Sequence, residues 1–96
     1  MPNYQPNLRD SLLKGPGSLE VLVASNNVAY YVGRAKAVSS TNKIGPFDIL
    51  PQHENFISLI YDKVIVVDER GEEHDFVCQS GLLEVSENRV RVFIGI

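Results

Sequence analysis

The sequence contains a single cysteine, Cys78, among its 96 residues. One cysteine excludes an internal disulfide and a cysteine-rich zinc site, and it is consistent with a reducing, intracellular compartment. Long apolar runs are also missing, because the longest covers five residues, from Val28 to Val32. A membrane-spanning helix needs about twenty apolar residues, and the N-terminus shows no apolar signal segment. We therefore expect neither a membrane span nor secretion.

Basic charge is scarce as well. Nine Lys and Arg face twelve Asp and Glu, which gives a formal net charge of −3. A nucleic-acid-binding protein usually carries a basic patch, and docking on anionic lipid needs a basic cluster. The sequence shows neither, so we expect no nucleic-acid partner and no direct membrane insertion. With 44% apolar and 22% charged residues, the chain has the composition of one soluble globular domain.

The chain divides into an arm and a β-rich domain. Three prolines, Pro2, Pro6 and Pro16, interrupt residues 1–17, which predicts an extended arm with at most one helical turn capped by Asp10. All 19 valines and isoleucines follow residue 18, and these β-branched residues favour strands. We therefore predict a β-sandwich domain over residues 18–96.

Short apolar or alternating stretches recur along this domain, and turn residues such as Asn26-Asn27, Ser80-Gly81 and Glu87-Asn88 separate them. The predicted strands cover residues 19–23, 28–32, 34–39, 47–50, 56–60, 64–67, 74–78, 82–85 and 89–94. Short strands with frequent turns are typical of an all-β fold. The sequence thus predicts an antiparallel β-sandwich of about eight to ten short strands.

Few residues suggest chemistry. The pairs His53-Glu54 and His74-Asp75 invite an acid–base or metal reading, but metal sites usually need three or four convergent ligands. We interpret both pairs as solvated residues near loops, and Cys78, in an apolar strand, as a small core residue. A hydrolase built on His53 and Glu54 would also need a nucleophile and an oxyanion pocket. We therefore expect no catalytic residue, no metal site and no cofactor.

Two apolar segments raise the question of a partner. Val64 to Val67 are four consecutive β-branched residues, and successive strand residues point to opposite faces of a sheet. One face enters the core, and the other needs cover from this chain's own loops or from another protein. Tyr30-Tyr31 poses the same question. The acidic run 68–73 is interpreted as a solvated hairpin tip.

Three motifs, in order, resemble one known family. Residues 45–60, GPFDILPQHENFISLI, resemble the Gly-x-Phe-Gly-Ile-Leu-Pro-Gly-His-Ala-Pro segment of the epsilon subunit of F-type proton ATP synthases, called delta in mitochondria. Residues 19–38 resemble the opening strands of that family. Residues 76–92 resemble its closing Ser-Gly-Gly segment and final hairpin. The resemblance covers residues 18–94, which correspond to the N-terminal β-sandwich of the family.

The chain departs from the family pattern at several positions. Asp48, Gln52 and Leu82 stand where the family carries glycine, and Pro46 stands where a polar or acidic residue is common. Glu54-Asn55 replaces Ala-Pro. Most of these changes fall in the loop that faces the membrane c-ring in the family.

The resemblance implies a role without catalysis. Family members clamp the gamma stalk and seat it on the c-ring, so that proton-driven rotation reaches the catalytic head of the complex. By this resemblance the ring side is assigned to Gly45, Pro46, Gln52 and His53. The apolar excess around Tyr30, Val64 and Val66 suggests the gamma side. The implied location is the cytoplasmic side of an energy-transducing membrane, held there through the synthase complex.

One alternative stays open. The chain ends where the helical hairpin of the family would begin, and that hairpin inhibits ATP hydrolysis and in some members binds ATP. We therefore expect neither activity here. The altered loop and the missing hairpin also fit a stand-alone, epsilon-like binding module that has been recruited to another partner.

Overall fold

The computed structural model describes residues 17–95, and within that range it consists of strands without a helix. The strands are β1 (Leu19–Ala24), β2 (Ala29–Asn42), β3 (Gly45–Ile49), β4 (Phe56–Asp68), β5 (Glu73–Ser86) and β6 (Arg89–Ile94). The predicted all-β class is confirmed. The predicted arm lies outside the described residues except for Gly17. No helix among residues 17–95 is long and apolar enough to cross a membrane.

The predicted number of strands was wrong, because three pairs of predicted strands are single long strands. β2, β4 and β5 have 14, 13 and 14 residues, and each joins two stretches that the sequence predicts as separate strands. Gly33, where the sequence predicts a bulge or bend, lies inside β2. The register of β4 against β5 shifts between Ile60 and Asp62, and Asp62 has a φ of 75°. Such irregularities bend a strand sharply without ending its pairing.

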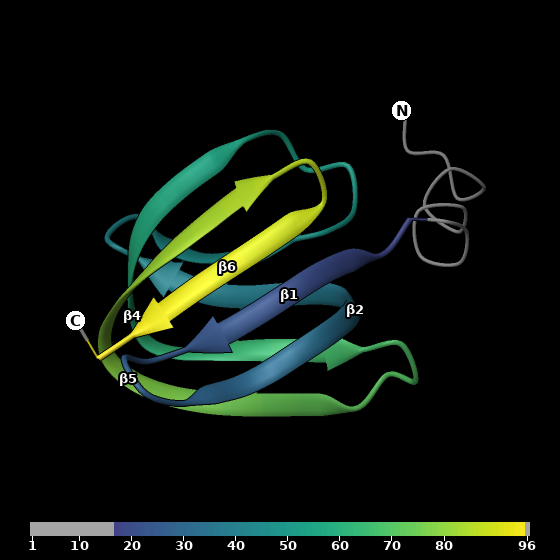
Figure 1. Ribbon diagram of the computed structural model, residues 1–96. Helices are drawn as coiled ribbons and strands as arrows, with labels where there is room; N and C mark the ends of the chain where they lie inside the picture. Colours follow the sequence, from purple (N-terminus) through teal and green to yellow (C-terminus); the bar gives the residue numbers. More distant parts are fainter. Residues whose placement is uncertain (1–16, 96) are drawn as a thin grey trace.

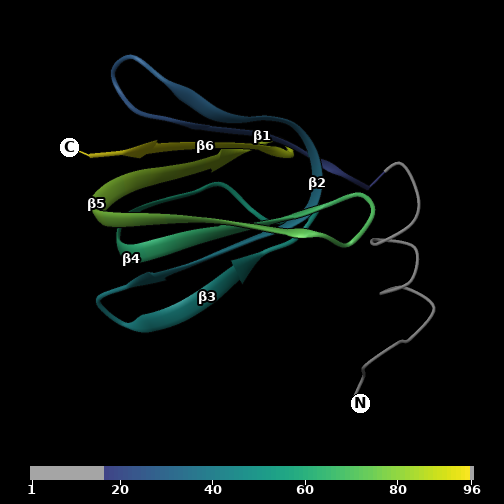
Figure 2. The same cartoon turned by 90° about the horizontal axis from the view of Figure 1, so that it is seen from below.

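The bent strands build a two-layered sandwich (Figures 1 and 2). In the first layer β1 pairs with the first half of β2 on one side and with β6 on the other. β6 also pairs with the second half of β5, which in turn pairs with the first half of β4. The second layer consists of the first half of β5, the second halves of β4 and β2, and β3. β1 and β6 run parallel, and the other pairs run antiparallel. Three strands therefore belong to both layers.

The core lies between the layers and is almost entirely aliphatic. Its fully buried large side chains are Leu19, Val23, Val38, Ile49, Ile60, Val64, Val66, Leu83, Val85, Val90 and Val92. Alternation along each strand places these residues inward and their neighbours outward. Cys78 is buried in the same cluster, which confirms its interpretation as a core residue.

Aromatic and histidine side chains form ring contacts at two places beside the aliphatic core. On one side Tyr30 lies against Phe76 and Tyr31 against His74, with ring centroids 6.1 and 5.3 Å apart. On the other side Phe56 contacts both Phe47 and His53, at 5.4 and 5.6 Å. Tyr31, Phe47, Phe56 and Phe76 are partly buried and pack against the core, whereas Tyr30 is exposed.

The assignment of Val64 and Val66 to a partner surface was wrong about the face of the strand. Both side chains are 0% exposed and belong to the core. The outward residues of the same segment are Ile65 and Val67, which are half-buried. The pattern of four β-branched residues was correctly read as a strand with two apolar faces, but it does not tell which alternate set points inward.

Candidate protein interface

The loop between β3 and β4 is held in one conformation by backbone contacts. The amide of His53 donates to the carbonyl of Leu50 at 3.1 Å, which closes a turn around Pro51 and Gln52. The amide of Gln52 donates to Oδ1 of Asn88 at 2.7 Å. Because Asn88 lies in the turn between β5 and β6, this bond ties two loops together at one end of the sandwich. Gln52 and His53 are thus presented on a braced surface.

Gly45 and Pro46 lie elsewhere. They begin β3, directly after the turn from β2, where Oδ1 of Asn42 accepts from the amides of Ile44 and Gly45 at 2.9 and 3.2 Å. Gln52 follows the opposite end of β3. A strand of this length spans about 15 Å, so the structure does not bring the four predicted ring-side residues into one cluster.

No hydrogen bond joins His53 or His74 to Cys78 in the part of the chain that the structure describes. Nδ1 of His53 lies 2.8 Å from the backbone carbonyl of Glu54 and so contacts the main chain of that residue. Burial raises the pKa of the Cys78 thiol, with a smaller contribution from the negative charge of Asp62. A raised pKa keeps the thiol protonated and weakly nucleophilic.

An acidic turn between β4 and β5 brings together three residues that the sequence reading did not combine. Nε2 of His74 lies 2.9 Å from Oδ2 of Asp68, and Oδ1 of Asp68 accepts from the amides of Arg70 and Glu72 at 2.9 Å each. One carboxylate oxygen of Glu72 lies within 4.8 Å of the polar atoms of the other two residues. Every contact of Asp68 organises the turn, so we interpret the group as a structural cap. An aspartate followed at once by a predicted turn is the signal that could have indicated it.

The acidic turn should make stability depend on pH. The hydrogen bond from His74 and the two backbone amides hold the pKa of Asp68 below its ordinary value of 3.8. A carboxyl with a lowered folded-state pKa stabilises the fold above the unfolded pKa, and this contribution is lost as pH falls through the folded value. We expect Asp68→Asn to lower the melting temperature at neutral pH, and this difference to shrink below about pH 4.

Melting temperatures of the wild type and of Asp68→Asn, measured between pH 2.5 and 7, would check this prediction. Asp75→Asn is the matched control, because Asp75 is an exposed carboxylate on the neighbouring strand β5, next to His74. A difference for Asp68→Asn that stayed constant across the whole pH range would contradict the assigned role of the charge.

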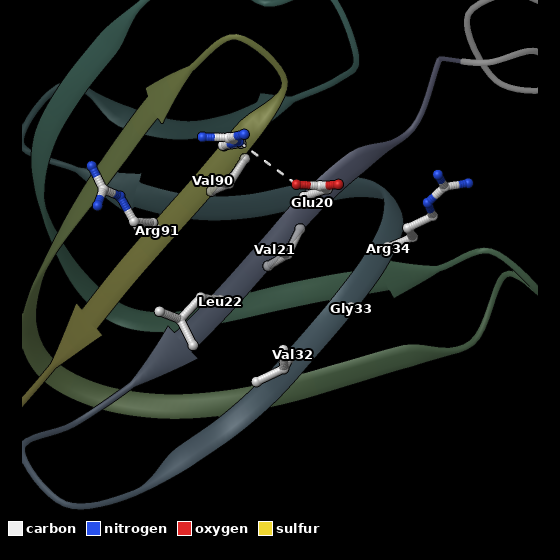
Figure 3. A pocket seen from close by; sticks show the side chains of 9 residues that line it. Glu20, Val21, Leu22, Val32, Gly33, Arg34, Val90 and Arg91 are labelled. Carbon is white, nitrogen blue, oxygen red and sulfur yellow. Dashed lines mark ion pairs between the residues drawn. The ribbon is translucent and has the colours of Figure 1, made fainter.

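A shallow groove on the outer face of the first layer was not predicted. It has a volume of about 330 Å³ and runs over β2, β1 and β6 (Figure 3). Its apolar floor includes Leu22 and Val32, and Arg34, Arg89 and Arg91 stand around it. Tyr30, which the sequence reading did single out, belongs to the same end of β2 and is 46% exposed.

The braced loop and the fold match one family. The sequence pattern of "ATP synthase, Delta/Epsilon chain, beta-sandwich domain" matches residues 18–95. The chain belongs to this family. The predicted resemblance is thereby confirmed over nearly the whole described part of this epsilon-family chain.

Individual relatives agree. The ATP synthase epsilon chain of Xanthomonas oryzae pv. oryzae, strain PXO99A, is 30% identical over 73 residues, which cover 75% of this chain and 52% of that protein. The epsilon-family chain thus spans about half the length of the curated relatives it matches.

Solved structures agree on the fold. A chain in the mitochondrial ATP synthase of Euglena gracilis (OSCP/F1/c-ring) is similar with a TM-score of 0.76 and 16% identity, over 82% of this chain and 51% of that one. A chain in the central stalk/c-ring structure of the Tetrahymena thermophila mitochondrial ATP synthase gives 0.69 and 10%, over 81% and 63%.

The structure explains how the epsilon-family chain accommodates its departures from the family pattern. Gln52 adopts a φ of 73°, in the left-handed region that glycine enters most readily, so the backbone keeps its shape although the glycine is gone. Asp48 has no positive φ and accepts a hydrogen bond from the Ser39 hydroxyl at 2.5 Å. Leu82 is half-buried, and its neighbour Leu83 fills the core instead. None of the three substitutions requires another fold.

Proposed function

We propose that the epsilon-family chain is a part without catalytic activity of the central stalk of a proton-translocating rotary ATP synthase. In this role it binds the gamma subunit and the loops of the c-ring, and it passes the rotation of the ring to the stalk. The observation that carries the proposal is the family match across residues 18–95. By the same proposal the protein works on the inner face of an energy-transducing membrane through the complex, without inserting into the bilayer.

The architecture suits a part that transmits torque. A two-layered sandwich could yield by sliding one layer over the other, but here β2, β4 and β5 run through both layers. Shear between the layers would have to deform three continuous strands. The aliphatic core between the layers is closely packed, and closely packed interiors have low compressibility. These two properties make the domain a stiff element.

For the ring side we propose the loop with Gln52 and His53. The hydrogen bond from Gln52 to Asn88 anchors this loop to the β5–β6 turn, so a load on the loop would pass directly into two strands of the first layer. Gly45 and Pro46 would reach the ring only as a second patch, because they lie at the other end of β3. Tyr30 remains the proposed residue on the gamma side.

The test is assembly with purified partners. The full chain is mixed with the gamma subunit and analysed by size-exclusion chromatography with light scattering, and we expect a one-to-one complex. Liposomes that contain the c-ring should then co-sediment with this complex, whereas liposomes without the ring should not. An interface of standard size supports dissociation constants in the micromolar range or below.

The absence of any complex with gamma at tens of micromolar would contradict the stalk role. The stand-alone binding module would then be the better description of the chain. If the complex with gamma forms but does not bind liposomes that contain the c-ring, the contact with gamma stands and the proposed ring contact at Gln52 and His53 is contradicted.

A further inference from the structure

The groove on the first layer combines an apolar floor with unbalanced positive charge. Leu22 and Val32 are direct partners across β1 and β2, so their side chains stand next to each other on the outer face (Figure 3). Val32 is 74% exposed, which is unusual for a large aliphatic residue in the middle of a strand. Exposed apolar residues that lie side by side on a surface often mark a site where another protein binds.

The charged residues around the floor are mostly arginines, whereas the chain as a whole carries a negative net charge. Arg34 forms no ion pair within residues 17–95, and Nε of Arg89 lies 3.7 Å from Oε1 of Glu20 in a loose, exposed pair. Only Arg91 has a close partner, with its Nη2 2.7 Å from Oε1 of Glu84. The groove therefore presents at least one unpaired guanidinium on a chain whose net charge is −3. This arrangement is complementary to a carboxylate.

The neighbouring edge of β2 is open. Residues 29–33 pair with β1 on one side, and no strand of the described part of the chain pairs with their other side. Residues 28–33 carry no charge and no proline, although exposed edges are usually protected by such residues. Backbone groups on an open edge can accept a further strand from a partner.

We propose that the groove and the open edge of β2 together form the seat for an extended, acidic segment of the gamma subunit. An apolar side chain of this segment packs on Leu22 and Val32. A carboxylate from another residue of the same segment pairs with Arg34. The inference rests on the proposed function for the identity of the partner. It moves the gamma contact from the buried Val64 and Val66 to an exposed surface beside Tyr30.

The experiment measures the affinity of purified gamma for variants of the full chain by titration calorimetry. Val32→Asp puts a carboxylate on the floor of the groove and should weaken binding about ten-fold or more, as for a central interface residue. Val77→Asp is the matched control, because Val77 is an 83% exposed strand valine in the half of β5 that belongs to the second layer. We expect it to change the affinity by less than about two-fold.

Charge and backbone pairing are tested separately. Arg34→Glu should weaken binding and reduce its dependence on salt, because the attraction between opposite charges is screened by ions. Hydrogen exchange on the wild-type chain should show slower exchange at residues 29–33 when gamma is bound, and this measurement depends on no variant. Melting curves establish that each variant is folded.

The outcomes separate this inference from the stalk role. If the wild type fails to bind gamma, the proposed function fails and this inference fails with it. If the wild type binds gamma but Val32→Asp, Arg34→Glu and exchange at residues 29–33 show no effect, the stalk role stands and the seat is overturned. A tighter complex with Arg34→Glu would contradict the acidic nature of the segment.

Discussion

Replacing Val66 by aspartate should remove a large part of the stability of the domain. The side chain of Val66 is 0% exposed and belongs to the core cluster between the two layers. The substitution removes about 2 kcal/mol of apolar burial and introduces a carboxyl group without a hydrogen-bond partner. The combined cost should exceed about 4 kcal/mol, against a total stability of about 5–10 kcal/mol for a domain of this size.

Val77→Asp is the matched control for this prediction. It makes the same chemical change at a strand valine that is 83% exposed, so we expect a change of no more than about 0.5 kcal/mol. Urea denaturation followed by circular dichroism would measure both variants. If Val66→Asp kept wild-type stability, Val66 would have to face outward, and the arrangement of the core described above would be incorrect.

This prediction also shows what sequence reasoning could determine about the fold. The all-β class followed from valine and isoleucine content, and the turns at Asn26-Asn27 and Glu87-Asn88 followed from residue type. The inward face of residues 64–67 could not be predicted, because all four are β-branched and give no alternation to read. The structure decides it through the partners of the strand, which place Val64 opposite Phe76 and Val66 opposite His74.

The number of strands failed for a related reason. Gly33, Asp62 and Gly81 each lie between two hydrophobic stretches, so stretches that are read one at a time are counted as separate strands. In the structure β2, β4 and β5 continue through these residues. β4 and β5 stay paired with each other on both sides of their bends, and β2 passes from β1 to β4 at Ala35. The local sequence indicates where a strand bends. Only the pairing with neighbouring strands shows that the strand continues through the bend.

The candidate interface was predictable in part. The family resemblance led to the loop with Gln52 and His53, and the structure shows that Asn88, 36 residues away, braces it. The groove was missed because its floor and its arginines come from three separate strands. The alternation of Arg89, Val90, Arg91 and Val92 is that of a strand with a basic outer face, which the sequence analysis did not use. The apolar partner across the sheet, Leu22, could be found only from the parallel register of β1 and β6.

Gly81 in β5 leaves no room for a side chain. A methyl group at this position would lie 2.8 Å from the backbone carbonyl oxygen of Phe93, and 3.2 and 3.3 Å from two side-chain carbons of Ile60. The carbonyl belongs to the main chain of β6, so relief would require the two strands to move apart. We expect Gly81→Ala to lower the free energy of unfolding by about 2–3 kcal/mol, the cost typical of overpacking in a core.

Two further variants identify the cause of this loss. Gln79→Ala changes an exposed residue of the same strand and should alter stability by less than about 0.5 kcal/mol. Ile60→Val in the Gly81→Ala background shortens the nearby side chain but leaves the clash with the carbonyl of Phe93, so it should not restore stability. Full rescue by Ile60→Val would show that the side chain of Ile60, and not the close approach of β5 and β6, makes glycine necessary at this position.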